Sequence, residues 1–147
     1  MKTFQGRVIT PGEACAEAVV TKQGFNTLAS LQMALQFGDK EVKCGDQSNE
    51  ELYGKPLIGK ALCLPQTIGS TTGGLVLYCA CSMKKNPACM LFANHIDSLA
   101  AAGAVLADVW VDGVSMPVID SLGEDFLEYV KDGMKITVKE NGIVEVE

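Results

Sequence analysis

One loop of small residues carries the hydroxyls in this sequence that are best suited to chemistry. Gly69-Ser70-Thr71-Thr72-Gly73-Gly74 lies between the apolar segment 60–65 and an apolar segment of helix length, 75–83. This order predicts a strand-to-helix junction with Ser and Thr in N-cap positions. Free N–H groups at a helix N-terminus attract phosphate or carboxylate, and glycines let a ligand approach the backbone. The loop therefore either binds an anion or forms a plain N-cap turn.

Two familiar catalytic sites do not fit this loop. No lysine stands where a phosphate-binding P-loop requires one, which argues against a nucleotide site. The sequence lacks G-x-S-x-G, and its single histidine, His95, has no orienting carboxylate, since Asp97 two residues later would not face it on a helix. We therefore do not expect a Ser-His-Asp hydrolase. His95 is interpreted as a helix-start residue, and Asp97 as a first-turn acid favoured by the helix dipole.

The cysteines are the other candidate metal ligands. They are Cys15, Cys44, Cys63, Cys79, Cys81 and Cys89. No C-x-x-C pair occurs, so the strong zinc signatures are absent. The first residues lack the apolar stretch of a signal peptide, which predicts a cytoplasmic, reducing setting. We therefore expect the thiols to be small packing residues rather than disulfides or metal ligands, and no metal on this chain.

Composition limits the class of protein further. The chain has 147 residues, of which 48% are hydrophobic and 20% charged, with a formal net charge of -6. This balance argues against a disordered chain and against a membrane span. A nucleic-acid binder with a broad basic surface is also not expected, because neutralising phosphates requires clustered Lys and Arg. The length predicts one domain over residues 1–147.

The elements that position the loop follow from the apolar patterns along the chain. Strands are predicted at 4–9, 14–21, 60–65, 87–93 and 114–119, and a hairpin is predicted at 134–138 and 143–146 around Asn141-Gly142. Helices are predicted at 75–83 and 95–107, with a helical turn at 126–131. Segment 26–37 is ambiguous and only partly fits a helical face, whereas 43–54 is polar and predicts a surface loop. The fold class is α/β, with a mixed sheet or flattened barrel and covering helices.

An ordered set of short segments resembles the small subunit, or swivel domain, of the aconitase X family. The resemblance covers about residues 5–138, and its central segment is PQTIGSTTG at 65–73. The other segments are Gly12-Glu13-Ala14, Glu17–Val20, Leu52-Tyr53-Gly54, Ile58–Leu62, Asn86-Pro87-Ala88, Asp97 with Ala101–Val105, and Met116-Pro117-Val118.

The resemblance implies a swivelling β/β/α domain like domain four of aconitase. Such a domain docks on a large subunit that carries an iron–sulfur cluster, and known members are hydro-lyases that dehydrate cis-3-hydroxy-L-proline or mevalonate 5-phosphate. The resemblance implies that Ser70 is the catalytic base and that Gly69, Thr71, Thr72 and Gly73 contact a small hydroxy-acid substrate. The cluster iron would act as a Lewis acid on the leaving hydroxyl. The chain alone is then expected to be inactive.

Three segments depart from the family pattern. Residues 28–35 lack the usual Gly-Gly, Glu50-Glu51 replace a His-Pro pair, and Thr67-Ile68 replace an Arg-Gly pair. Fewer cations and glycines near the loop are consistent with another hydroxy acid as substrate or with lost activity. Two alternatives to a catalytic subunit therefore remain, a non-catalytic swivel or assembly module and an independent anion-binding domain.

Overall fold

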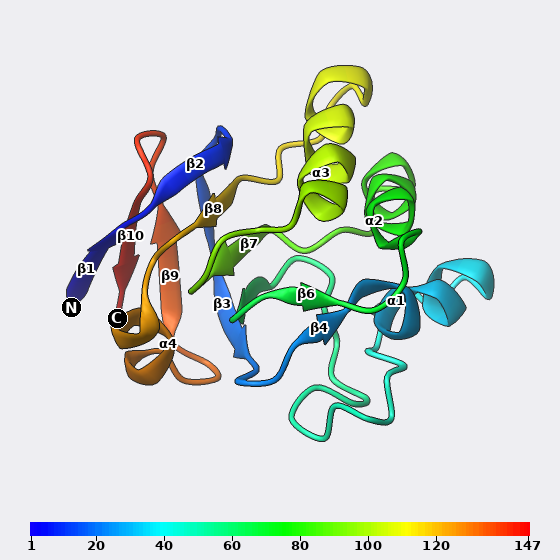
Figure 1. The fold of residues 1–147 in the computed structure, drawn as a ribbon, viewed down its shortest axis with the longest axis horizontal. Helices are drawn as coiled ribbons and strands as arrows, with labels where there is room; N and C mark the ends of the chain where they lie inside the picture. The colour runs from blue at the N-terminus through cyan, green and yellow to red at the C-terminus, as the bar shows by residue number, and fades with distance from the viewer.

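A nearly closed mixed sheet organises the chain in the computed structural model, which describes residues 1–147 (Figure 1). The strands of the sheet are β1 (Lys2–Gln5), β2 (Arg7–Thr10), β3 (Ala14–Val20), β5 (Ala61–Leu64), β7 (Cys89–Phe92), β8 (Val118–Asp120), β9 (Lys135–Val138) and β10 (Ile143–Val146). Their order is β1-β10-β9-β3-β5-β7-β8-β2. The two edge strands, β1 and β2, are separated in the chain only by Gly6, so the edges of the sheet meet there. The predicted α/β class, with a mixed sheet or flattened barrel and covering helices, is confirmed.

Crossover helices connect the parallel part of the sheet. Strands β3, β5, β7 and β8 are parallel neighbours. The helices between them are α1 (Thr27–Gln36), α2 (Gly73–Ser82) and α3 (Ser98–Trp110). A short parallel pair, β4 (Phe25–Asn26) and β6 (Thr67–Ile68), precedes α1 and α2, and a fourth helix, α4 (Glu124–Tyr129), precedes the hairpin. Because the strands are parallel, all three crossover helices begin at the same end of the sheet.

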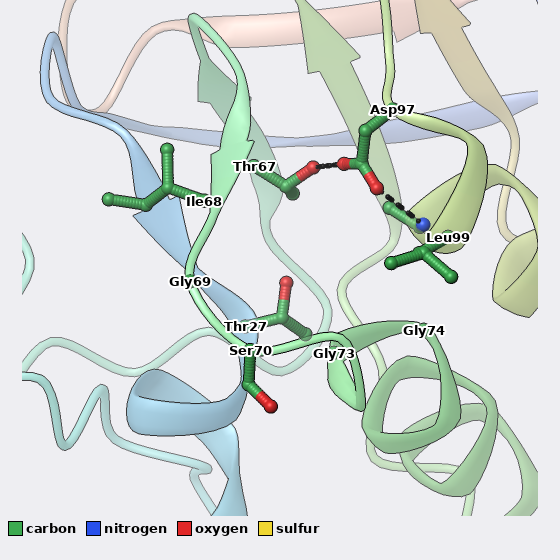
Figure 2. A pocket seen from close by; sticks show the side chains of 10 residues that line it. Thr27, Thr67, Ile68, Gly69, Ser70, Gly73, Gly74, Asp97 and Leu99 are labelled. Carbon is green, nitrogen blue, oxygen red and sulfur yellow. Dashed lines mark hydrogen bonds between the residues drawn. The ribbon is translucent and has the colours of Figure 1, made fainter.

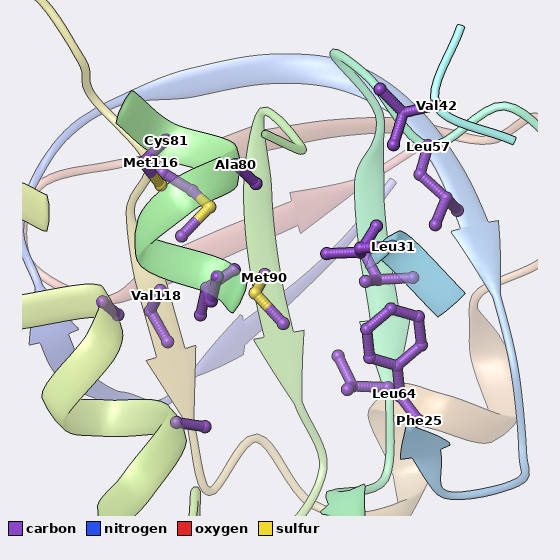
Figure 3. Packing of buried hydrophobic residues seen from close by; sticks show 14 of the residues in the cluster. Phe25, Leu31, Val42, Leu57, Leu64, Ala80, Cys81, Met90, Met116 and Val118 are labelled. Atoms are coloured by element: carbon purple, nitrogen blue, oxygen red, sulfur yellow. The ribbon is translucent and has the colours of Figure 1, made fainter. Parts of the chain in front are cut away.

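The parallel strands bury side chains on both of their faces, which explains their continuous apolar sequence. Leu64 of β5 and Met90 of β7 pack in one core with residues of α1, α2 and α3 (Figure 3). Leu62 of β5 belongs to the same core. The alternate residues of the same strands, including Cys63 and Cys89, face a second core with the hairpin strands and α4. None of the helices is long and apolar enough to cross a membrane.

Several element boundaries differ from the sequence prediction. The strand predicted at 4–9 is broken at Gly6, where a Cβ would lie 2.6 Å from the Asp120 carbonyl oxygen. Helix α2 begins at Gly73, two residues early, and α3 begins at Ser98, so His95 is exposed in the loop before the helix and is not the helix-start residue. The ambiguous segment forms α1. Its start is fixed by Asn26, whose Oδ1 accepts a hydrogen bond from the Ala29 amide at 3.1 Å.

The polar segment 43–54 is irregular, as predicted, but it is more than a surface loop. Leu52 is fully buried in the core that also contains the buried residues of α1, and the carboxamide of buried Asn49 hydrogen-bonds to Thr21. Glu51 accepts hydrogen bonds from the Thr21 hydroxyl at 2.9 Å and from the Lys22 amide at 2.8 Å. Glu51 therefore contributes to holding this segment against the end of β3.

Candidate functional site

A pocket of about 230 Å³ lies where α1, α2 and α3 begin (Figure 2). Thr27 lines it from α1, Gly73 and Gly74 from α2, and Leu99 from α3. Asp97 and the segment Thr67–Ser70 complete most of its wall. Ligand sites in open α/β sheets occur at this same place, beyond the carboxyl ends of parallel strands. The predicted loop is thus part of a cavity built from three crossover units.

The N-terminus of α2 differs from those of its neighbours in having no side-chain cap. Asn26 caps α1 and Asp97 caps α3, whereas the Thr72 hydroxyl at the N-cap of α2 bonds to no helix amide. Of the Ser and Thr residues predicted in N-cap positions, only Thr72 is the N-cap, and its hydroxyl does not act as a cap. The amides of Gly74 and Leu75 make no hydrogen bond to a protein acceptor. This helix end can therefore donate hydrogen bonds to an anion.

Ser70 bonds to Thr72 at the mouth of the pocket. Its Oγ accepts a hydrogen bond from the Thr72 amide at 3.1 Å and lies 2.7 Å from the Thr72 hydroxyl oxygen. Ser70 is exposed, and Figure 2 shows its side chain pointing away from Thr67 and Asp97. Its hydroxyl therefore faces the open side of the loop.

Asp97 connects two walls of the pocket. Its Oδ1 accepts a hydrogen bond from the Thr67 hydroxyl, and its Oδ2 accepts one from the Ala100 amide at 3.0 Å. Asp97 is therefore the N-cap of α3 and not a first-turn acid, because its backbone is extended (φ -73°, ψ 158°). These bonds fix β6, and with it the start of the Ser70 loop, relative to α3.

Thr27 provides the most enclosed hydroxyl of the pocket. The residue is 2% exposed, its hydroxyl makes no hydrogen bond in the structure, and Figure 2 shows the oxygen directed into the cavity. Because this hydroxyl is free and lines the cavity, it is suited to bonding a ligand.

The structure distributes the predicted site residues over two neighbouring surfaces. Gly69, Ser70 and Gly73 line the pocket, whereas Thr71 lines an adjoining groove between α2 and α3. Thr72 lines neither and contacts Ser70 instead. Gly69 has φ +95°, and a Cβ there would lie 2.5 Å from the side-chain nitrogen of Asn26, so the tight turn requires glycine.

Sequence analysis did not assign the other polar side chains of the pocket to the site. Thr27 and Thr67 gave no signal of their own, and Asp97 was assigned only to a helix start. They come together because β3, β5 and β7 are parallel neighbours, and strand order cannot be read from local patterns. The one available signal was the position of Asp97 in the first turn of the predicted helix 95–107.

The pocket contains one carboxylate, that of Asp97, and no Lys or Arg side chain lines it. No three His, Cys, Asp or Glu side chains of the chain lie close enough together to hold a metal ion. Burial raises the pKa of the Cys81 thiol to about 11 and that of Cys89 to about 12, which disfavours the thiolate that a metal needs. These residues do not fit an iron–sulfur cluster.

The prediction that all six cysteines are buried packing residues is wrong for two of them. Cys15 on β3 and Cys79 on α2 are exposed, whereas the other four are buried. All six are free thiols. The buried four fit the role of small apolar core residues.

Comparisons with known proteins give one consistent family. The sequence model described as the aconitase X swivel domain matches residues 3–146. The chain is 32% identical over 146 residues to the phosphomevalonate dehydratase small subunit of Aeropyrum pernix, covering 97% of this chain and 92% of that one. It is 28% identical over 137 residues to the protein of the same name from Methanosarcina mazei, covering 92% and 83%. The crystal structure of Thermococcus kodakaraensis aconitase X in its holo form is similar over 100% of this chain and 99% of that chain, with 26% identity and a TM-score of 0.81.

Proposed function

The chain belongs to the aconitase X swivel domain family, and from this we propose that it is the small subunit of a hydro-lyase, a dehydratase of a small hydroxy acid. The relatives named phosphomevalonate dehydratase small subunit support mevalonate 5-phosphate as the first substrate to test. We treat residues 1–147 as one swivel domain that acts in the cytoplasm with a large subunit. The iron–sulfur cluster that the family resemblance implies is assigned to that subunit, because the residues of this chain do not fit one.

Ser70 is the proposed base, and the contacts of its oxygen carry the proposal. A serine hydroxyl is a poor base unless its ionised form is stabilised. Both the Thr72 amide and the Thr72 hydroxyl lie within hydrogen-bond distance of Ser70 Oγ, and both can donate to an alkoxide. The uncapped N-terminus of α2 adds a favourable dipole. These groups favour the charged form of Ser70.

The proposed reaction is an elimination. Ionised Ser70 takes a proton from a substrate carbon, so a C–H bond breaks and a Ser O–H bond forms. The electron pair of that C–H bond becomes a carbon–carbon double bond, and the C–O bond on the neighbouring carbon breaks. The leaving hydroxide accepts a proton from solvent and departs as water, and Ser70 then returns its proton to solvent, so the net products are the alkene and one water molecule. On this chain, the amides at the start of α2 and the Thr27 hydroxyl orient the substrate.

The charge of the pocket supports a site shared between two subunits. A substrate with a carboxylate or phosphate needs cations, and this pocket provides only the Asp97 carboxylate. Ser70 also faces the open side of its loop rather than the enclosed part of the pocket (Figure 2). We therefore assign the cations and the opposite wall to the large subunit.

The experiment is turnover by the reconstituted two-subunit complex with the Ser70→Ala variant. We expect a loss of about a thousandfold or more in kcat, because proton transfer to a positioned base is removed, while assembly is unchanged. Ser48→Ala is the matched control, since it removes an exposed serine hydroxyl that lines neither the pocket nor the groove beside it. Unchanged turnover in Ser70→Ala would exclude Ser70 as the base.

An assembled wild-type complex that dehydrates neither mevalonate 5-phosphate nor cis-3-hydroxy-L-proline would favour a non-catalytic swivel module. Tight anion binding by the isolated chain, with no partner, would favour an independent binding domain.

A further inference from the structure

Helices α2 and α3 share an exposed apolar face. We define this uncharged face by five exposed residues, Leu75 on α2, and Leu99, Leu106, Val109 and Trp110 on α3. Trp110 is 68% exposed and Leu75 63%. Surface helices normally place charged residues toward water, and large apolar patches mark interaction sites. The face is therefore suited to contact with another protein.

The absence of charge makes this face different from the rest of the surface. Asp108 is the only charged residue in α1, α2 and α3 together. By contrast, the short helix α4 contains Glu124, Asp125 and Glu128, and it lies at the other end of the molecule with both chain termini (Figure 1). Protein interfaces are depleted of charge at their centre and enriched in aromatic residues. Both properties occur together on α2 and α3.

A groove of about 310 Å³ runs along this face between α2 and α3. Leu75 and Tyr78 line it from α2, and Leu99, Leu106 and Trp110 line it from α3. A large aromatic side chain beside an apolar groove is the usual composition of a binding hot spot.

The groove is continuous with the pocket that contains Ser70. Gly74 and Leu99 line both of them, and Thr71, next to Ser70, lines the groove. A protein seated in the groove would therefore also form a wall of the pocket. That wall is where the proposed function requires cations.

We infer that the uncharged face is the surface on which the large subunit docks, with Trp110 and Leu75 as its anchoring side chains. This inference rests on the proposed function, because the relatives that are named small subunits point to a large-subunit partner rather than to a second copy of this chain. When the large subunit docks on this face, the same contact also completes the wall of the pocket that contains Ser70.

The test measures the dissociation constant between the purified chain and the purified aconitase X large subunit of the same organism. Trp110→Lys and Leu75→Lys each place a charge on an exposed position of the face, so the fold tolerates them. We expect each to weaken binding about 30-fold or more. Glu128→Lys on α4 is the matched control, because it alters charge on an exposed helix outside the face, and its binding should equal that of the wild type. Unchanged thermal unfolding of the three variants is the check that they are folded.

Two exposed thiols provide an independent readout without any substitution. Cys79 lies on α2 in a second groove, between α1 and α2, that Leu75 also lines. Cys15 lies on β3 in the sheet. We expect complex formation to slow alkylation of Cys79 and to leave alkylation of Cys15 unchanged. Equal rates at Cys79 in the free chain and in the complex would overturn the inference.

The outcomes separate this inference from the proposed function. If the complex dehydrates substrate and binds with wild-type affinity in both lysine variants, the docking surface is wrong and the function stands. If the wild-type chain does not bind the large subunit but forms a dimer that Trp110→Lys dissociates, the face joins two copies, and both proposals fail. Ser70→Ala should bind normally, which keeps the loss of activity distinct from the loss of docking.

Discussion

Thr27 is the least exposed polar residue of the pocket, and its hydroxyl has no hydrogen-bond partner in the structure. A valine at this position keeps the shape of the side chain and removes the hydroxyl. We expect Thr27→Val in the assembled enzyme to raise KM about three- to tenfold, as expected for one lost neutral hydrogen bond, with kcat and thermal unfolding nearly unchanged. Steady-state kinetics measure this split. An unchanged KM would show that Thr27 only fills space.

Two other buried hydroxyls provide a matched comparison of stability. The Ser30 hydroxyl in α1 has no hydrogen-bond partner, whereas Thr10 donates to the Met116 carbonyl at 2.8 Å and accepts from the Val118 amide at 2.9 Å. Both residues are 1% exposed. Urea unfolding of Ser30→Ala should give a free energy of unfolding equal to the wild type or up to about 1 kcal/mol higher. Thr10→Val should lower the free energy of unfolding by about 1–3 kcal/mol, because it leaves the Met116 carbonyl and the Val118 amide without their hydrogen-bond partner. The opposite order would contradict the assignment of these bonds.

At the scale of single residues, the sequence predicted which residue types could do chemistry better than it predicted which side chains lie next to one another. Ser70 and its glycines were found because a hydroxyl loop before a helix is a local pattern. The exposure of Cys15 and Cys79 was missed, since a cysteine in an apolar segment is usually buried. Asp97 was placed at a helix start, but its bond to Thr67 depends on β6, a strand too short to predict.

Helices α2 and α3 pack through their backbones at two glycines. A Cβ on Gly103 would lie 2.1 Å from the Gly74 carbonyl oxygen, so the helices would have to separate. A Cβ on Gly73, the residue before Gly74, would lie 3.5 Å from the Cβ of Thr27, which is an ordinary contact. We expect Gly103→Ala to lower the free energy of unfolding by about 1–3 kcal/mol, although alanine favours helix, and Gly73→Ala to change it by less than about 1 kcal/mol. Chemical denaturation measures both. A Gly103→Ala variant as stable as the wild type would contradict this packing.

At the scale of elements, strand and helix types were mostly predictable and their boundaries were not. The parallel strands were found as apolar runs, and Asn141-Gly142 located the hairpin. Gly6 was missed as a strand break because the reason for it is distant in the sequence, the close approach of β8. Leu52 was assigned to a surface loop because its neighbours are polar, yet the long-range bonds of Asn49 and Glu51 hold that segment against the core.

The Arg7–Asp120 ion pair joins β2 to β8 where the sheet closes. Asp120 is fully buried, and Arg7 donates two hydrogen bonds to it, at 2.9 and 2.6 Å. Burial alone would raise the pKa of Asp120, but the hydrogen bonds from Arg7 and the Ile96 amide outweigh it and lower the pKa. Because the folded state favours the charged carboxylate, this stabilisation is present above about pH 4 and is lost as the pH falls through the lowered pKa.

The expected consequence is a pH-dependent effect of Arg7→Met. The variant should be less stable than the wild type at pH 7, since it leaves Asp120 buried without its cation. The difference should shrink below about pH 4, where the carboxyl of the variant is neutral. Free energies of unfolding measured from pH 3 to pH 7 give both the difference at pH 7 and its decrease at low pH. Lys139→Met, which removes a surface pair with Glu145, is the control and should show little change across the range. A constant Arg7→Met difference would contradict the electrostatic role.

At the scale of the whole molecule, closure of the sheet places the first and last strands side by side. Lys2 is the register partner of Val146, and Figure 1 shows the two ends of the chain together, away from α1, α2 and α3. A linker of a few residues could therefore join the ends, and new ends could be opened between Gln47 and Ser48, which are both exposed. Such a circular permutant should keep the fold. For the same reason, a second domain fused to either end would leave the helical side of the molecule free.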